Sequence, residues 1–161
     1  MMETNDLVQR ISEIDWSKYQ TAYGPANQKY IPSTNWVTST PDLLIQLSSP
    51  DENIALKATH FLWCSICHQG MPSDAGLIAT PFLLEIVANS SSIEVKSEIL
   101  CIFNDWIFTI TETNNEIPSW ATEIMHLLTQ KIPFFQEIQA NAPPESDLAE
   151  FSKNIIENLT K

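Results

Sequence analysis

We predict that this chain of 161 residues forms a single all-α domain over residues 1–161. Two observations lead to that prediction: the chain contains only three glycines, and its apolar residues recur at three- and four-residue spacing. Proteins rich in tight β-turns need more glycine, whereas helices joined by short loops need little. Apolar residues make up 43% of the chain, which is enough to build a core without disulfides or metals.

The first helix is expected over residues 5–20, where apolar side chains fall on one helical face. These are Leu7, Val8, Ile11, Ile14, Trp16 and Tyr19. A turn signal, Ala22-Tyr23-Gly24-Pro25, follows and leads into an irregular polar segment that runs through Ser39. Trp36 lies within that segment, where it either pins the segment to the core or makes an exposed contact.

From residue 40 onward the sequence repeats itself. Thr40-Pro41 and the apolar residues that follow match Thr80-Pro81 and the residues after it, at an offset of 40. Further along, Ile54-Ala55-Leu56-Lys57-Ala58 matches Ile93-Glu94-Val95-Lys96-Ser97 at an offset of 39. We interpret each unit as a short helix with proline in its first turn, then a polar turn and a longer helix. A proline costs nothing in a first turn because its missing N–H would have no partner there.

A third, degenerate unit starts near Pro118, and Pro133 is expected to end or bend its first helix. A final amphipathic helix is expected at roughly 145–160. The units therefore cover about 40–70, 80–112 and 117–160. A period near 40 with two helices per unit is typical of HEAT or armadillo repeats. We predict a HEAT/armadillo-like α-α superhelix of about three helix pairs plus N- and C-terminal helices.

The second long helix is apolar on most sides and carries one polar strip, which is acidic. Its carboxylates are Glu94, Glu98, Asp105 and Glu112, interrupted by Cys101. The formal net charge of the chain is −12. Such a field repels nucleic acid and anionic membranes and speeds encounter with basic partners. The alternative is that the acidic surface only keeps the protein soluble.

Several motifs together resemble small bacterial HEAT-repeat proteins. They are Trp16, the Ala22-Tyr23-Gly24 turn, the His68-Gln69-Gly70 helix end and Pro81-Phe82-Leu83. The likeness covers roughly residues 16–105, but residues 27–39 look like an insertion, and Met71-Pro72-Ser73-Asp74 lacks the aromatic of the family pattern. Members of this group often sit beside secreted bacterial toxins and look like their immunity proteins. The resemblance therefore implies a role in neutralising a toxin.

A second class of function is suggested by Cys64-Ser65-Ile66-Cys67-His68, which matches the C-x-x-C-H motif of haem attachment. With Cys101 the same residues could form a zinc site, so a metal- or haem-binding redox protein is the alternative. Against it, His68 has a structural interpretation as part of a helix end closed by Gly70. Trp63 and its neighbours are expected to pack in the core.

The sequence contains no G-x-S-x-G, H-E-x-x-H, phosphate-loop or calcium-loop motif, so we expect a binding protein, not an enzyme, with no cofactor. The leading hypothesis is an immunity protein that binds a basic bacterial toxin domain, and a general adaptor of the same fold is not distinguished from it. The candidate partner-binding residues are Glu94, Glu98, Asp105, Glu112, Asp51, Glu52, Asp74, Glu85, Trp36 and Trp120.

The N-terminal residues Met1-Met2-Glu3-Thr4-Asn5-Asp6 are polar and acidic, unlike a signal peptide. No stretch approaches the roughly 18 apolar residues of a membrane span. We therefore expect a cytoplasmic protein that binds neither membrane nor nucleic acid, with its three cysteines reduced.

Overall fold

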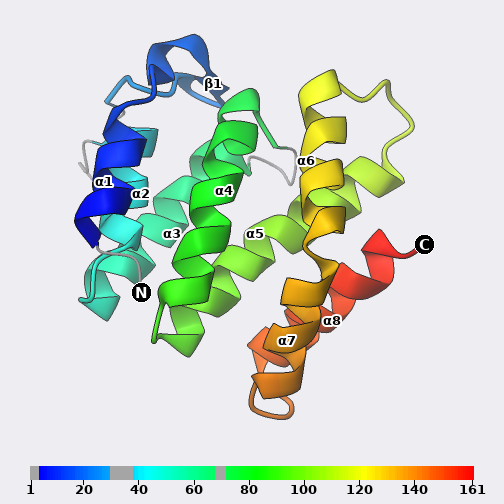
Figure 1. The fold of residues 1–161 in the computed structure, drawn as a ribbon. Coiled ribbons are helices and arrows are strands. Elements are labelled where there is room, and N and C mark those ends of the chain that lie inside the picture. The colour runs from blue at the N-terminus through cyan, green and yellow to red at the C-terminus, as the bar shows by residue number, and fades with distance from the viewer. Residues whose placement is uncertain (1–3, 30–37, 68–71) are drawn as a thin grey trace.

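The computed structural model describes residues 4–29, 38–67 and 72–161, and within these ranges it is mostly helical (Figure 1). The helices are α1 (Thr4–Ser12), α2 (Thr40–Leu47), α3 (Glu52–Ile66), α4 (Asp74–Asn89), α5 (Ile93–Glu112), α6 (Ser119–Gln130), α7 (Ile132–Asn141) and α8 (Asp147–Leu159). One 3-10 turn (Trp16–Lys18) and a hairpin of β1 (Gln20–Thr21) and β2 (Gly24–Pro25) complete the described elements. The all-α prediction is confirmed.

The expectation of a helix over residues 5–20 is wrong in its second half. Helix α1 ends at Ser12, and the chain then turns through the 3-10 segment into the β1–β2 hairpin. The cause is the buried Trp16, whose Nε1 donates a hydrogen bond to the carbonyl of Ile11 at 2.9 Å and folds the chain back on α1. Gly24, at φ +124°, supplies the left-handed backbone that the hairpin requires.

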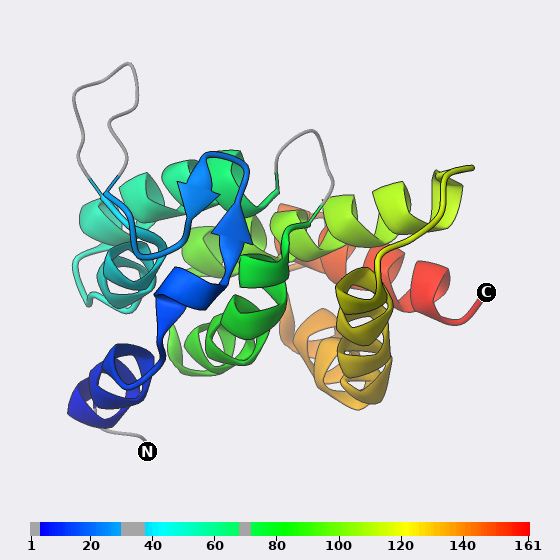
Figure 2. The same ribbon diagram turned by 90° about the horizontal axis from the view of Figure 1, so that it is seen from above.

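The helices form two layers (Figure 2). Helices α2, α4 and α6 lie in one layer, where α2 packs on α4 and α4 packs on α6. Helices α3, α5 and α8 lie in the other layer, where α5 packs on both α3 and α8. Helix α2 packs on α3, α4 on α5, and α7 on α8, so the two layers are joined by antiparallel neighbours along the chain.

Two hydrogen bonds set the register between α3 and α5. Near the N-termini of both helices, the Ser92 hydroxyl donates to Glu52 Oε2 at 2.7 Å. Near the C-terminus of α3, the buried Trp106 donates its Nε1–H to the Ile66 carbonyl at 2.8 Å. Each bond joins residues 40 positions apart, so α3 and α5 run parallel and in register.

The expectation that a helix begins at Thr80-Pro81 is wrong, and the helix pair given as 80–112 begins earlier. Helix α4 starts at Asp74, where the Ser73 hydroxyl accepts a hydrogen bond from the backbone N–H of Gly76. Pro81 therefore lies inside the helix. Ser73 is a strong capping residue, and the turns before Pro81 bury Ala75 and Ala79, which offsets the lost helical hydrogen bond.

Two other prolines lie where the sequence predicted them. Pro41 is in the first turn of α2, which Ser39 caps by accepting from the backbone N–H of Asp42. Pro133 is in the first turn of α7, and the helix is interrupted at Lys131, between the end of α6 and the start of α7. The final helix, Asp147–Leu159, also falls within the expected range of 145–160. In the described ranges, no helix is both long and apolar enough to cross a membrane.

We expect the substitution Pro81→Ala to raise the free energy of unfolding by about 1–3 kcal/mol, because alanine restores a donor for the Leu77 carbonyl. The ring of Pro81 is exposed, so the substitution removes no core contact. Pro41→Ala is the matched control, and we expect it to change the free energy by less than about 0.5 kcal/mol. Urea unfolding measures both. Equal effects of the two substitutions would contradict a helix that begins at Asp74.

Candidate functional site

A groove of about 710 Å³ lies between α3 and α5, bordered by the first residue of α8. Helix α3 contributes Leu56, Thr59, His60 and Trp63 to its lining. Helix α5 contributes Ile93, Glu94, Ser97, Glu98, Cys101 and Asp105, and α8 contributes Asp147. We call this feature the acidic groove.

The register of the two helices explains why these residues meet. Within each helix the lining residues follow the i, i+3, i+4, i+7 pattern, so they form a stripe on one face. Because α3 and α5 run parallel and in register, the two stripes border the same hollow along its length. The opposite faces of both helices, including Leu62 and Ile99, are buried in the core.

The lining of the acidic groove carries four carboxylates and neither lysine nor arginine. The carboxylates are Glu94, Glu98, Asp105 and Asp147. Three of these carboxylates affect the thiol of Cys101. Burial raises the pKa of this thiol, and the negative charges of Asp105, Glu98 and Asp147 raise it further, to about 11. Burial, followed by Asp105 and Cys101, also raises the pKa of the Cys67 thiol. A cation entering the groove would therefore be attracted, and an anion repelled.

Trp63 is the aromatic residue of the groove, and its side chain is 40% exposed. Its Nε1 donates a hydrogen bond to Asp105 Oδ2 at 3.0 Å, which ties the indole of α3 to the carboxylate of α5. The expectation that Trp63 packs in the core is therefore wrong. It follows two buried residues, Phe61 and Leu62, and an unbroken apolar run does not indicate which of its members faces outward.

Of the predicted partner-binding residues, the structure brings Glu94, Glu98 and Asp105 together in the acidic groove. Glu112 is exposed at the C-terminal end of the same helix, outside the lining. Trp120 is half-buried in α6 and packs against the core. Trp36 lies outside the described residues.

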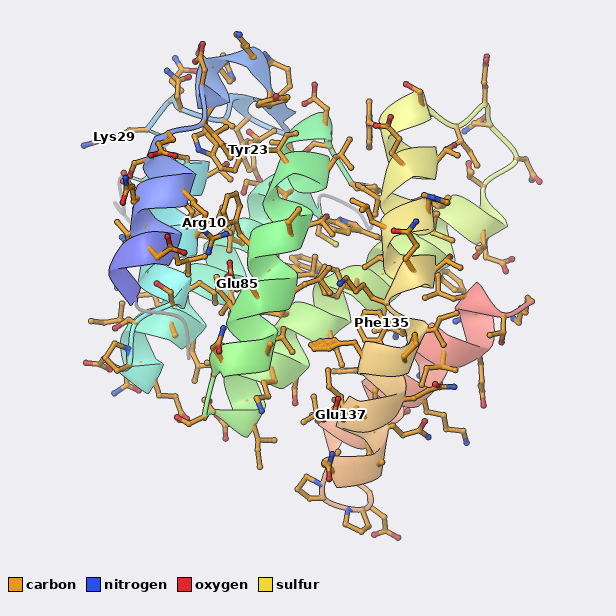
Figure 3. All side chains as sticks on the ribbon, viewed as in Figure 1. Arg10, Tyr23, Lys29, Glu85, Phe135 and Glu137 are labelled. Carbon is orange, nitrogen blue, oxygen red and sulfur yellow. The ribbon has the colours of Figure 1, made fainter. Side chains whose placement is uncertain are left out.

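The other predicted carboxylates lie elsewhere and have structural partners. Asp51 caps α3 by accepting hydrogen bonds from two backbone N–H groups of its first turn. Asp74 accepts from the backbone N–H of Gln20 and so ties the hairpin to α4. Glu85 forms an ion pair with Arg10 between α4 and α1, in which Arg10 Nη2 donates to both carboxylate oxygens, at 2.7 and 2.8 Å (Figure 3). Glu52, besides accepting from Ser92, lines a smaller hollow of about 390 Å³ between the polar turns, as does Glu85.

The residues of the metal alternative are only partly described. Cys64 is half-buried, Cys67 is buried, and Cys101 lies in the acidic groove. Burial raises the pKa of the Cys64 thiol as it does for the other two. His68 lies outside the described residues. Among the residues that are described, no group of three or more His, Cys, Asp or Glu side chains could hold a metal ion.

Sequence reasoning did not place His60, Trp63 or Asp147 in the groove. His60 and Trp63 lie three apart on α3, on the helix face that borders the acidic strip of α5, so a comparison of the outer faces of both long helices could have found them. Asp147 is the first residue of α8, and its place beside α5 depends on how the last three helices pack. No local pattern in the sequence indicates that position.

Comparison with known proteins identifies no relative: no family model, no curated protein and no solved structure matches this chain. The lining of the groove shows which chemical groups it can receive. Its carboxylates can pair with cationic side chains, its indole can stack on a guanidinium, and its hollow can exclude water around both. The lining is therefore chemically suited to cationic groups.

Cys101 offers a test of the negative potential. In a Cys64→Ala background, we expect its alkylation by iodoacetamide to increase with pH towards a midpoint near 11, because the thiolate is the reacting form. Glu98→Gln removes one neighbouring negative charge, so the pKa falls and the rate at pH 8 rises severalfold. Peptide mass spectrometry measures the rate. Glu137→Gln, on α7 and away from the groove, is the control (Figure 3). Equal rates in the two variants would contradict the proposed field.

Proposed function

We propose that this protein is a non-enzymatic binding protein whose acidic groove receives a basic protein partner. The observation that carries the proposal is the set of four groove carboxylates around the half-exposed Trp63. Partly exposed aromatic residues within a charged rim are typical of the residues that dominate the affinity of protein interfaces. The hydrogen bond from Trp63 to Asp105 holds the indole in place before a partner arrives, which lowers the entropy lost on binding.

We further propose that the helices form a HEAT/armadillo-like superhelix of about three pairs: α2 with α3, α4 with α5, and the broken helix α6–α7 with α8. The 40-residue offset of the two hydrogen bonds between α3 and α5 supports this assignment. So does the placement of α3, α5 and α8, the second members of the pairs, in one layer (Figure 2). Repeat arrays of this kind present successive helices as one continuous binding surface.

The partner that fits best is the basic domain of a bacterial toxin, which makes this chain an immunity protein that acts in the cytoplasm. Enzymes that act on nucleic acid carry basic surfaces that meet phosphates. An acidic protein with complementary charge reaches such a surface quickly and covers it. The net charge of −12 and the uniform sign of the groove lining both support this partner.

The test is co-expression with the product of the neighbouring gene. We expect the protein to form a complex with that product and to relieve its toxicity. Reversal of Glu94, Glu98 and Asp105 to Lys should weaken the complex at least ~100-fold, about 2.7 kcal/mol, because attraction becomes repulsion. Titration calorimetry measures the affinity, and circular dichroism checks that the variant is folded.

The matched control reverses three exposed carboxylates outside the groove, Glu116, Glu123 and Glu137, and so changes the net charge by the same amount. We expect this control to keep its affinity within a few-fold. If both triple variants lose affinity equally, only net charge matters and the groove is not the binding site. If no complex forms with the wild-type protein, the toxin partner is wrong.

A further inference from the structure

We infer that the partner segment seated in the acidic groove is an amphipathic basic α-helix lying along α3 and α5. This inference rests on the proposed function and adds the form of the recognised segment. Three features of the groove support it: the spacing of its lining residues, the short side chains on its floor, and the backbone groups of that floor, which are hydrogen-bonded within their own helices.

The spacing of the lining matches the way in which one helix presents a face to another. On α3, the stripe Leu56, Thr59, His60 and Trp63 follows the i, i+3, i+4, i+7 pattern. On α5, the stripe from Glu94 to Asp105 follows the same pattern and spans about 17 Å, or three helical turns. Two parallel helices with adjacent outward stripes form a furrow into which the side chains of a third helix can pack.

The floor and the walls of the groove differ in chemistry. Thr59 and Ser97 are buried and short, and they leave room for a helix to approach closely between α3 and α5. The walls carry the indole of Trp63 and the carboxylates. A matching helix has apolar or small residues facing the floor and Lys or Arg on its flanks. An arginine there can stack on the indole while its guanidinium reaches Asp105 or Glu98.

The backbone of the groove argues against an extended peptide. An extended segment is bound mainly through main-chain hydrogen bonds, which need free N–H and C=O groups on the receptor. The floor comes from positions well inside α3 and α5, where backbone groups are bonded within their own helices. Along this floor, side chains face the occupant, and recognition by side chains is the mode in which a helix binds to a groove.

A second copy of this chain is a poorer occupant. The residues that line the groove bring four carboxylates and no lysine or arginine, so two copies meeting at this face would repel each other. The same charge disfavours nucleic acid. Charge complementarity therefore selects a basic protein helix.

The experiment uses two synthetic peptides of identical composition. The first is an 18-residue peptide of Lys, Arg, Leu and Ala arranged as an amphipathic helix. The second has the same sequence but carries two adjacent D-residues at its centre, which break the helix without changing charge. We expect the helical peptide to bind at least ~10-fold more tightly, measured by calorimetry at physiological salt. Glu98→Lys with Asp105→Lys should remove most of this binding, whereas Glu123→Lys with Glu137→Lys should not.

Each other outcome has a definite meaning. If both peptides bind equally and both depend on Glu98 and Asp105, the helical form is wrong while the acidic binding groove stands. If neither peptide binds, or if binding ignores the groove substitutions, the groove itself is wrong and the proposed function fails with it. Trp63→Phe keeps an aromatic ring but lacks the N–H that bonds Asp105, so we expect it to weaken the helical peptide severalfold.

Discussion

The parallel packing of α3 on α5 is the interaction on which the rest of the structure depends. Trp106 fixes it: the indole is buried, and its Nε1–H bonds to the Ile66 carbonyl at the end of α3. The same ring lies against α4, where a Cβ added at Gly76 would come within 3.1 Å of it. One side chain of α5 therefore contacts the two helices that precede it.

The acidic groove exists because α3 and α5 pack in this register. Once the register of α3 and α5 is set, the faces opposite the core lie side by side, and Trp63 reaches Asp105 across the boundary. Helix α8 packs on the same helix, α5, and adds Asp147 at the rim. Four carboxylates that are far apart in sequence, or separated by a turn of helix, thus contribute to one region of negative potential. The core packing and the acidic groove depend on the same pair of helices.

The sequence predicted the helical class because that class arises from local patterns of apolar residues and turns. It misplaced the start of α4, because a proline after threonine is compatible with a first turn or with a helix interior, and the cap at Ser73 decides between them. It identified Glu94, Glu98 and Asp105, which share one helix. It missed Trp63 and Asp147, because their exposure depends on contacts between helices that no local pattern encodes.

The central claim, that the acidic groove holds the partner, is tested most directly by photo-crosslinking in the complex. A benzoylphenylalanine placed at His60, on the wall of the groove, is predicted to form a crosslink to the product of the neighbouring gene. The same group at Glu137, on α7, is predicted to form none (Figure 3). A crosslink from position 137 and none from position 60 would contradict the account.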